Sequence, residues 1–216
     1  MDSAAKGESR RIHRHRSRRV GPAAAVCPHL CSTSAVELTV WCRSLLFNGH
    51  GYTVYDSADG RMIFRVDNYA HKWREEVLLM DSTGGVLLTV RRRRKMLGIK
   101  DNWEVYEGEI DVSSTPARRQ SPLFRVTKAL GNPSYTISPW GKSTAPAYRM
   151  NWSPREEWCQ IFAGAAVAPP RAEITRKCGG VARGELLGRD VLAVKIQPEM
   201  DQALVMALLM INDAMR

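Results

Sequence analysis

The feature that most constrains this fold is an unbroken apolar run near the C-terminus. Residues 203–211 carry no charge and follow shortly after Pro198. The pattern predicts a helix from about Glu199 to Met215, with Glu199 and Asp201 in its first turn, where negative charge suits the helix dipole. A helix that is apolar on every side is buried on every side or lies in lipid. The run spans only about 14 Å, too short for a bilayer, so we expect it in the middle of a protein core.

Much of the remaining chain predicts short antiparallel strands. Residues 52–55 and 62–66 flank an Asp-Gly turn, and residues 76–80 and 86–90 repeat this design. Further strand-like pieces lie at residues 123–126, 135–137, 158–162, 172–175 and 191–196. A β-rich protein can enclose such an apolar helix by closing a sheet around it, which also removes exposed strand edges. The residues alone therefore predict a mainly β protein with a central helix.

Several blocks of sequence occur in a familiar order. They are residues 38–49, 52–56, 64–69 and 201–208, together with the stretch from Leu87 through residues 91–95 to residues 101–106. These blocks resemble the LURP-one-related family of plants, whose fold is that of the tubby C-terminal domain. The resemblance covers roughly residues 26–216 and is most specific at Gln197-Pro198 and the following residues 201–204. The family usually has glycine after this proline, whereas this chain has Glu199.

The resemblance implies a closed antiparallel β-barrel of about twelve strands around the hydrophobic C-terminal helix. It also implies distant kinship with phospholipid scramblases and a link to plant defence, but no general biochemical activity. Tubby proteins bind membrane phosphoinositides through basic side chains. Those side chains have no residue-by-residue match in this sequence, so no binding residue is carried over.

The positive charge of this basic protein is unevenly distributed. The net charge is +10, and residues 112–155 hold seven basic residues and no acidic one. Residues 1–34 add seven basic residues against two acidic ones. We therefore expect a basic, disordered tail over residues 1–25 and one barrel domain over residues 26–216. The Arg-rich tail is also consistent with a nucleic-acid or nuclear-targeting patch, or with an organelle transit peptide.

Two basic clusters are candidate sites for an anionic ligand. The first is Arg91, Arg92, Arg93, Arg94 and Lys95, and the second is Arg118, Arg119 and Lys128, with Arg125, near Tyr135 and Trp140. Such clusters can hold a phosphate by charge-assisted hydrogen bonds. Two alternatives stay open. The first cluster can pair with Glu104, Glu107, Glu109 and Asp111 on the surface, and the two aromatic residues can fill the barrel core.

Motifs for catalysis and cofactor binding are missing from the sequence. It contains no Gly-x-Ser-x-Gly elbow, phosphate-cradling glycine loop or His-Glu-x-x-His motif. The spacing of Cys27 and Cys31 lacks the second ligand pair of a zinc site, and we expect five free thiols. We therefore expect no enzymatic activity, no catalytic residue, no cofactor and no metal.

Three functional hypotheses follow. The first is a non-catalytic tubby-like module that binds anionic phospholipid or a protein partner in plant defence-related signalling. The second is a nucleic-acid-binding protein that acts through its Arg-rich tail, which we favour less. The third is a scramblase-like activity. We expect a monomer without a transmembrane segment, in the cytoplasm or peripherally on a membrane, and the tail leaves a nuclear location open.

Overall fold

The computed structural model describes residues 25–42, 51–67, 76–93, 102–110, 120–128, 134–141, 146–153, 158–164, 168–177 and 190–214. In these ranges a short 3-10 helix, η1 (Pro28–Leu30), precedes twelve strands and one α-helix, α1 (Gln202–Ala214). The strands are β1 (Val36–Trp41), β2 (Tyr52–Asp56), β3 (Met62–Asp67), β4 (Glu76–Asp81), β5 (Val86–Arg93), β6 (Asn102–Glu107), β7 (Phe124–Lys128), β8 (Ser134–Pro139), β9 (Tyr148–Ser153), β10 (Trp158–Ala163), β11 (Ala172–Arg176) and β12 (Val191–Ile196).

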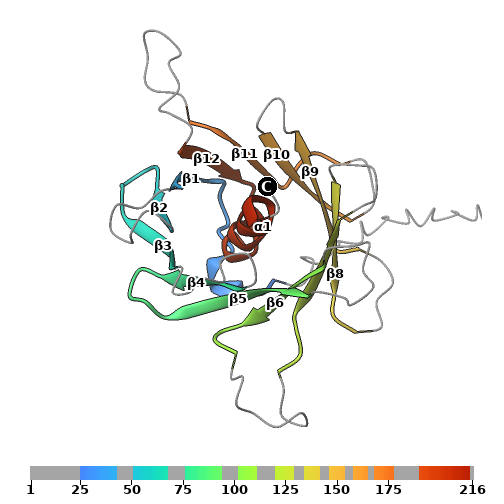
Figure 1. Ribbon diagram of the computed structural model, residues 1–216. Coiled ribbons are helices and arrows are strands. Elements are labelled where there is room, and N and C mark those ends of the chain that lie inside the picture. Colours follow the sequence, from blue (N-terminus) through green and yellow to red (C-terminus); the bar gives the residue numbers. More distant parts are fainter. Residues whose placement is uncertain are drawn as a thin grey trace, which may run out of the picture.

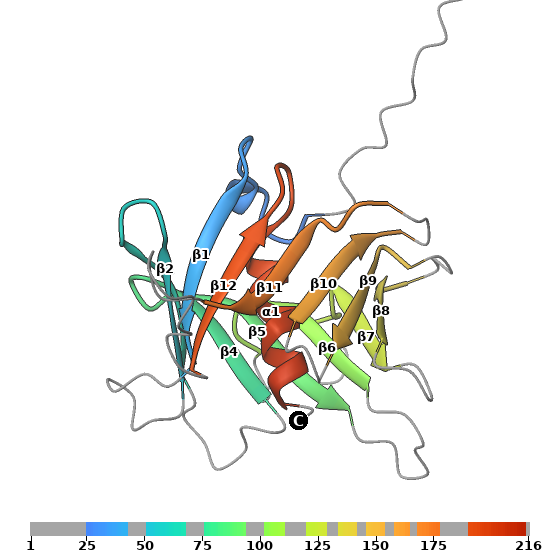
Figure 2. The same cartoon turned by 90° about the horizontal axis from the view of Figure 1, so that it is seen from above.

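The strands form one closed antiparallel barrel. Each strand pairs with the next along the chain, and β12 closes the ring by pairing with β1. Figure 1 looks down this ring with α1 inside it, and Figure 2 shows the same barrel from the side. The closed tubby-like barrel of about twelve strands around a C-terminal helix is therefore confirmed. Closure pairs every strand on both sides and leaves no open sheet edge among the described strands.

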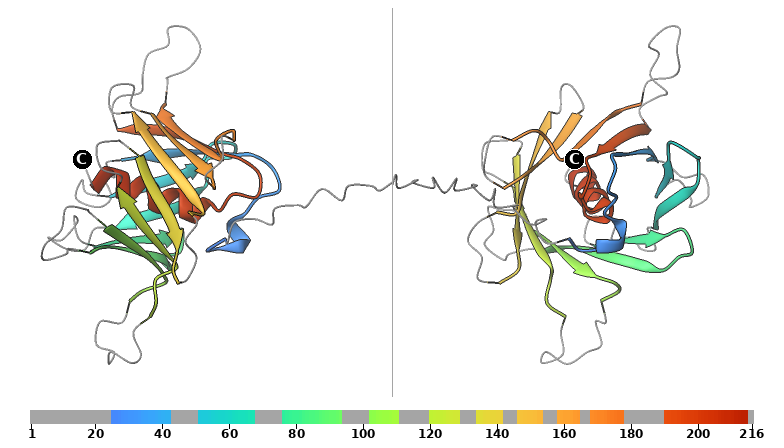
Figure 3. Two further views of the ribbon diagram at one scale, coloured as in Figure 1. Left: turned by 90° about the vertical axis from the view of Figure 1, so that its right-hand side faces the viewer. Right: turned by 180° about the vertical axis from the view of Figure 1, so that it is seen from behind.

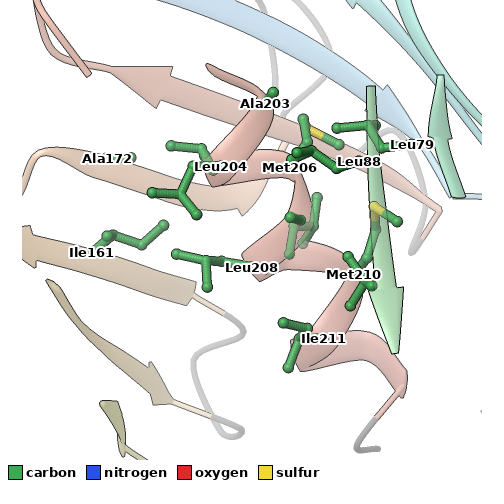
Figure 4. Packing of buried hydrophobic residues seen from close by; sticks show 14 of the residues in the cluster. Leu79, Leu88, Ile161, Ala172, Ala203, Leu204, Met206, Leu208, Met210 and Ile211 are labelled. Atoms are coloured by element: carbon green, nitrogen blue, oxygen red, sulfur yellow. The ribbon is translucent and has the colours of Figure 1, made fainter. Parts of the chain in front are cut away.

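Helix α1 is buried along nearly its whole length. Ala203 through Asn212 are all buried, because strands surround the helix on every side. Leu204 and Leu208 point toward Ile161 of β10, whereas Met206 lies beside Leu88 of β5 (Figure 4). No described helix has the length and apolarity that a membrane span requires.

The helix begins three residues later than the sequence predicts. Glu199 has a φ of +64°, in the left-handed region, so it cannot belong to the first helical turn. Asp201 precedes the helix and caps it, because its Oδ1 accepts hydrogen bonds from the backbone N–H groups of Ala203 at 2.9 Å and Leu204 at 3.1 Å. The left-handed backbone at Glu199 gives a physical reason for the glycine that the family prefers there.

The helix lies off the barrel axis. Its closest backbone neighbours are β4 and β5, and bulky inward side chains on β6 to β9 fill the wider space on the other side. These side chains include Trp103, Phe124, Tyr135 and Tyr148, all buried. The expected core role is therefore confirmed for Tyr135 and wrong for Trp140, which is 42% exposed. The predicted boundary between tail and barrel stays a prediction, because residues 1–24 lie outside the described ranges.

Candidate functional site

The first basic cluster lies partly on β5, which continues through Arg93. Leu88 and Val90 are fully buried, so alternation along the strand places Arg91 and Arg93 on the outer face of the barrel. Arg92 has the opposite parity and pairs in register with the buried Trp103. The other two residues of the cluster, 94 and 95, lie outside the described residues.

Both outward-facing arginines of β5 form ion pairs with carboxylates. The Arg91 Nε donates to Glu76 Oε2 at 2.7 Å, and its Nη2 lies 2.6 Å from the same oxygen. The Arg93 Nε lies 3.3 Å from Glu104 Oε2. The pairing of this cluster with Glu104 is therefore confirmed, and Glu76 is a partner that sequence reasoning missed. Because these charges are paired at the surface, the run of arginines on β5 is a weaker anion site than its sequence suggests.

Glu104 is buried although it belongs to the outer face. It is 2% exposed, and its register partners are Arg91 on β5 and Arg125 on β7. The Tyr106 hydroxyl donates to Glu104 Oε2 at 2.7 Å, and the Arg125 Nη2 lies 3.5 Å from Oε1. Burial, together with the nearby Glu104 carboxylate, raises the pKa of Tyr106 to about 12. The tyrosine therefore stays a neutral hydrogen-bond donor, and Glu104 sits as a counter-charge beneath Arg93 and Arg125.

Arg125, which belongs to the second basic cluster, lies on the outer face of the barrel formed by β7 to β9. The Arg125 guanidinium lies 4.6 Å from the centre of the exposed Trp140 ring. Lys128 is exposed at the end of β7, but it has the parity of the buried Val126 and pairs with the buried Tyr135, so it lies at the rim and not on this outer face. The guanidinium of Arg149 on β9 lies 5.5 Å from the centre of the Phe162 ring. All three strands come from the acid-free stretch of residues 112–155, so they carry no carboxylate. This region therefore presents cations and an exposed aromatic ring together.

Sequence reasoning found only part of this outer face. Residues 118 and 119 of the second cluster lie outside the described ranges, so their role stays a prediction. Arg149 was not among the predicted site residues. Its signal was available, since Tyr148 and Met150 alternate with it as inward residues of a strand in the same acid-free stretch.

Asp201 joins the start of the described chain to the start of α1, at the end of the barrel that we call its base. The Asp201 Oδ2 accepts hydrogen bonds from the backbone N–H groups of Val26 and Cys27, both at 2.6 Å. This holds the segment around η1 against the start of α1 (Figure 3). Burial, and secondarily Asp201, raise the pKa of the Cys27 thiol to about 11, and burial also raises that of Cys31. Protonated thiols are poor metal ligands, and the described residues contain no group of His, Cys, Asp and Glu suited to a metal ion.

Comparison with known proteins gives a consistent result. The family model described as LURP-one-related matches residues 36–213. Protein LURP-one-related 8 of Arabidopsis thaliana is 39% identical, covering 86% of this chain and 90% of that protein. Protein LURP-one-related 5 of the same plant is 35% identical, covering 82% and 81%. An X-ray structure of an Arabidopsis thaliana protein matches with a TM-score of 0.62 at 20% identity, over 90% of this chain and 99% of that one. This last likeness shows the shared fold.

Proposed function

This chain belongs to the LURP-one-related family, and we propose that it is a non-catalytic module that docks on membranes containing anionic phospholipid. The outer face of β7 to β9 carries the proposal, because Arg125, Arg149 and the exposed Trp140 lie there without a carboxylate on these strands. Each basic side chain near an anionic membrane contributes about 1 kcal/mol, and tryptophan favours the membrane–water interface.

The neighbouring strands extend this docking surface. Arg93 is exposed on the outer face of β5 despite its contact with Glu104. Lys128 alternates with the buried Phe124 and Val126, so it belongs to the inward-facing row of β7 and adds to the surface only at the rim of the barrel, where it is exposed. Arg91 contributes less, because Glu76 accepts two of its nitrogen contacts. The exposed tryptophan favours a lipid surface over an acidic protein patch, whose binding is the alternative outcome of the experiment below.

The other hypotheses have less support. Nucleic-acid binding depends on the tail, which lies outside the described residues. A scramblase that used α1 would need that helix to meet lipid, whereas Ala203 through Asn212 are buried inside the barrel. Both hypotheses, and the expected link to plant defence, stay predictions without a supporting contact.

Cosedimentation with vesicles tests the membrane proposal. The full chain should bind phosphatidylcholine vesicles that contain phosphatidylserine more tightly than vesicles of phosphatidylcholine alone, and added salt should weaken this binding. The substitution Arg125→Gln should lower the affinity by about fivefold, equivalent to about 1 kcal/mol. Arg61→Gln is the matched control, because Arg61 is exposed at the β2–β3 turn, far around the ring from β8 (Figure 1).

Four outcomes would contradict the proposal. Equal binding to neutral and anionic vesicles would exclude an electrostatic surface. Equal losses from Arg125→Gln and Arg61→Gln would move the surface away from β7 to β9. If deletion of residues 1–25 abolished all vesicle binding, the tail rather than the barrel would hold the lipid. Capture of an acidic peptide in place of vesicles would favour a protein partner.

A further inference from the structure

The register of β7, β8 and β9 brings four polar side chains together on the outer face. Arg125 pairs with Ser138, and Thr136 pairs with Arg149. Ile137, between the two hydroxyl-bearing residues, is fully buried, so Thr136 and Ser138 lie on the opposite, outer face of β8. The two hydroxyl groups therefore lie between two arginines that flank β8 from either side.

Sheet geometry sets the size of this group. Neighbouring strands are about 4.8 Å apart and alternate residues on one strand are about 6.8 Å apart, which places the Cα atoms of Arg125 and Arg149 about 12 Å from each other. That separation suits two long cationic side chains that close from opposite sides on one small anion. The anion would rest on the hydroxyls of β8.

The two guanidinium groups keep donors available for such an anion. Arg149 lies against the Phe162 ring, and its buried Nε has no hydrogen-bond partner. Arg125 lies against the Trp140 ring and touches Glu104 only at 3.5 Å. A guanidinium stacked on an aromatic ring still presents the N–H groups along its edge.

The hydroxyl groups between the arginines are also available. Within the described part of the chain, neither Thr136 nor Ser138 forms a side-chain hydrogen bond. The acid-free sequence of these strands leaves no carboxylate on β7 to β9 to compete for the same donors. Two guanidinium groups and two hydroxyls thus make a set of donors, and within the described residues Glu104 of β6, 3.5 Å from Arg125, is the carboxylate that contacts this set.

We propose that Arg125, Thr136, Ser138 and Arg149 form a site for a phosphate monoester presented by a lipid headgroup, such as that of phosphatidic acid. This inference rests on the proposed membrane docking and adds a preference among anionic lipids. A terminal phosphate offers three oxygens to the four donor groups, whereas a phosphodiester or a carboxylate offers two. Bidentate arginine contacts and hydroxyl donors both favour the terminal phosphate.

A substitution that preserves charge tests the site. The double variant Thr136→Val, Ser138→Ala removes both hydroxyls from the full chain and leaves every arginine in place. It should bind phosphatidic acid vesicles about tenfold more weakly, since hydrogen bonds to charged groups are the strong ones. Its binding to phosphatidylserine vesicles should stay within about twofold, because the surface charge is unchanged. Thr175→Val, an exposed hydroxyl on β11, is the matched control and should change neither affinity.

A second variant keeps the proposal testable if the first one packs poorly. Arg149→Lys retains the charge and removes the planar fork, so it should also weaken phosphatidic acid binding selectively. Thermal melting of each variant checks that the barrel is folded. Equal affinity of the unaltered chain for the two lipids, or equal losses for both lipids in either variant, would overturn the site.

Failure of membrane docking is distinguishable from failure of the site. If the unaltered chain binds no vesicles, the proposed function is wrong, and calorimetric titration with glycerol 3-phosphate then decides the site. Saturable binding that the double variant loses would support a site for a soluble phosphate monoester. No heat of binding would overturn it.

Discussion

The base of the barrel and its outer face each bury one carboxylate, Asp201 and Glu104, at 1% and 2% exposure. Within the described residues, the Asp201 carboxylate accepts hydrogen bonds from four backbone N–H groups, two at the start of α1 and two from Val26 and Cys27. Glu104 instead faces the Tyr106 hydroxyl and two guanidinium groups. The backbone N–H groups that Asp201 binds are fixed in position by the fold. The arginine side chains beside Glu104 can rotate and bind another anion. The two carboxylates are buried to a similar degree but differ in role. Asp201 joins two backbone segments, whereas Glu104 is a counter-charge for surface arginines.

The largest expected effect lies in the helix that Asp201 caps. Leu208→Asp should prevent folding, because an unpaired buried charge costs several kcal/mol and a domain's total stability is about 5–15 kcal/mol. Leu208 is fully buried within the barrel. Circular dichroism and thermal melting would check this, with Leu208→Met as a volume-matched control. A cooperatively melting Leu208→Asp protein would contradict the central role of α1.

Removing the carboxylate at the base should be the next largest effect. Asp201→Ala leaves four backbone N–H groups without their acceptor, and we expect a loss of about 3 kcal/mol in the free energy of unfolding. Asp201→Asn keeps one acceptor oxygen and should lose less. Urea denaturation measures both. Vesicle binding by the folded Asp201→Asn protein should be unchanged. If this variant lost vesicle binding, the purely structural role of Asp201 would be contradicted.

The base should also respond to alkaline pH. Burial raises the pKa of the Cys27 thiol in the folded protein from its ordinary value of 9.0 to about 11. Folded protein therefore holds a proton that the unfolded chain releases, so stability is complete below pH 9 and falls as the pH rises through about 11. We expect a loss of up to about 3 kcal/mol from this group. Cys27→Ala should reduce the loss of stability between pH 9 and 11, whereas Tyr106, whose pKa is raised to about 12, still lowers stability above pH 10 in the variant. An unchanged slope would exclude Cys27 as a source of the loss.

On the outer face, removing the carboxylate should act mainly on binding. Glu104→Gln keeps the side-chain shape and should cost about 1 kcal/mol of stability, because Tyr106 retains an acceptor. It also releases Arg93 and Arg125 from their counter-charge, so affinity for anionic vesicles should rise by about fivefold. Chemical denaturation and vesicle cosedimentation would measure the two effects. Weaker vesicle binding would show that Glu104 holds the arginines in their binding positions.

The smallest predicted effect concerns the turn before the helix. Glu199→Gly should raise the free energy of unfolding by about 0.5 kcal/mol, because glycine adopts the left-handed backbone without steric strain but loses more entropy on folding. The backbone N–H of Glu199 donates to the Ser32 carbonyl at 2.8 Å, and the substitution retains this bond. Urea denaturation measures the change. A destabilised protein would mean that the glutamate side chain contributes at this turn.

Local pattern predicted some elements better than others. Strands β2 to β4 were predicted to within one residue, since alternating apolar residues flank turns that end in glycine, whereas β5 starts where predicted and runs three residues further, through Arg93. Strand β9 was missed, because it joins two aromatic residues and a methionine to Arg149 and Asn151, which have weak β propensity. The strand is stabilised by hydrogen bonds to β8 and β10, which the intrinsic β propensity of its residues does not predict.

The sequence by itself determined that the final helix is buried, because a short, wholly apolar helix is not stable when it is exposed to water, and the chain's many strand-like pieces favoured a sheet as the cover. It also determined where cations outnumber acids. Only the tertiary structure decided which cations are neutralised, since Glu76 and Glu104 reach Arg91 and Arg93 across strand pairs. Register likewise decided that Arg149 stands across β8 from Arg125. Neighbours of this kind are set by the pairing between strands, and their separation along the chain does not predict that they meet.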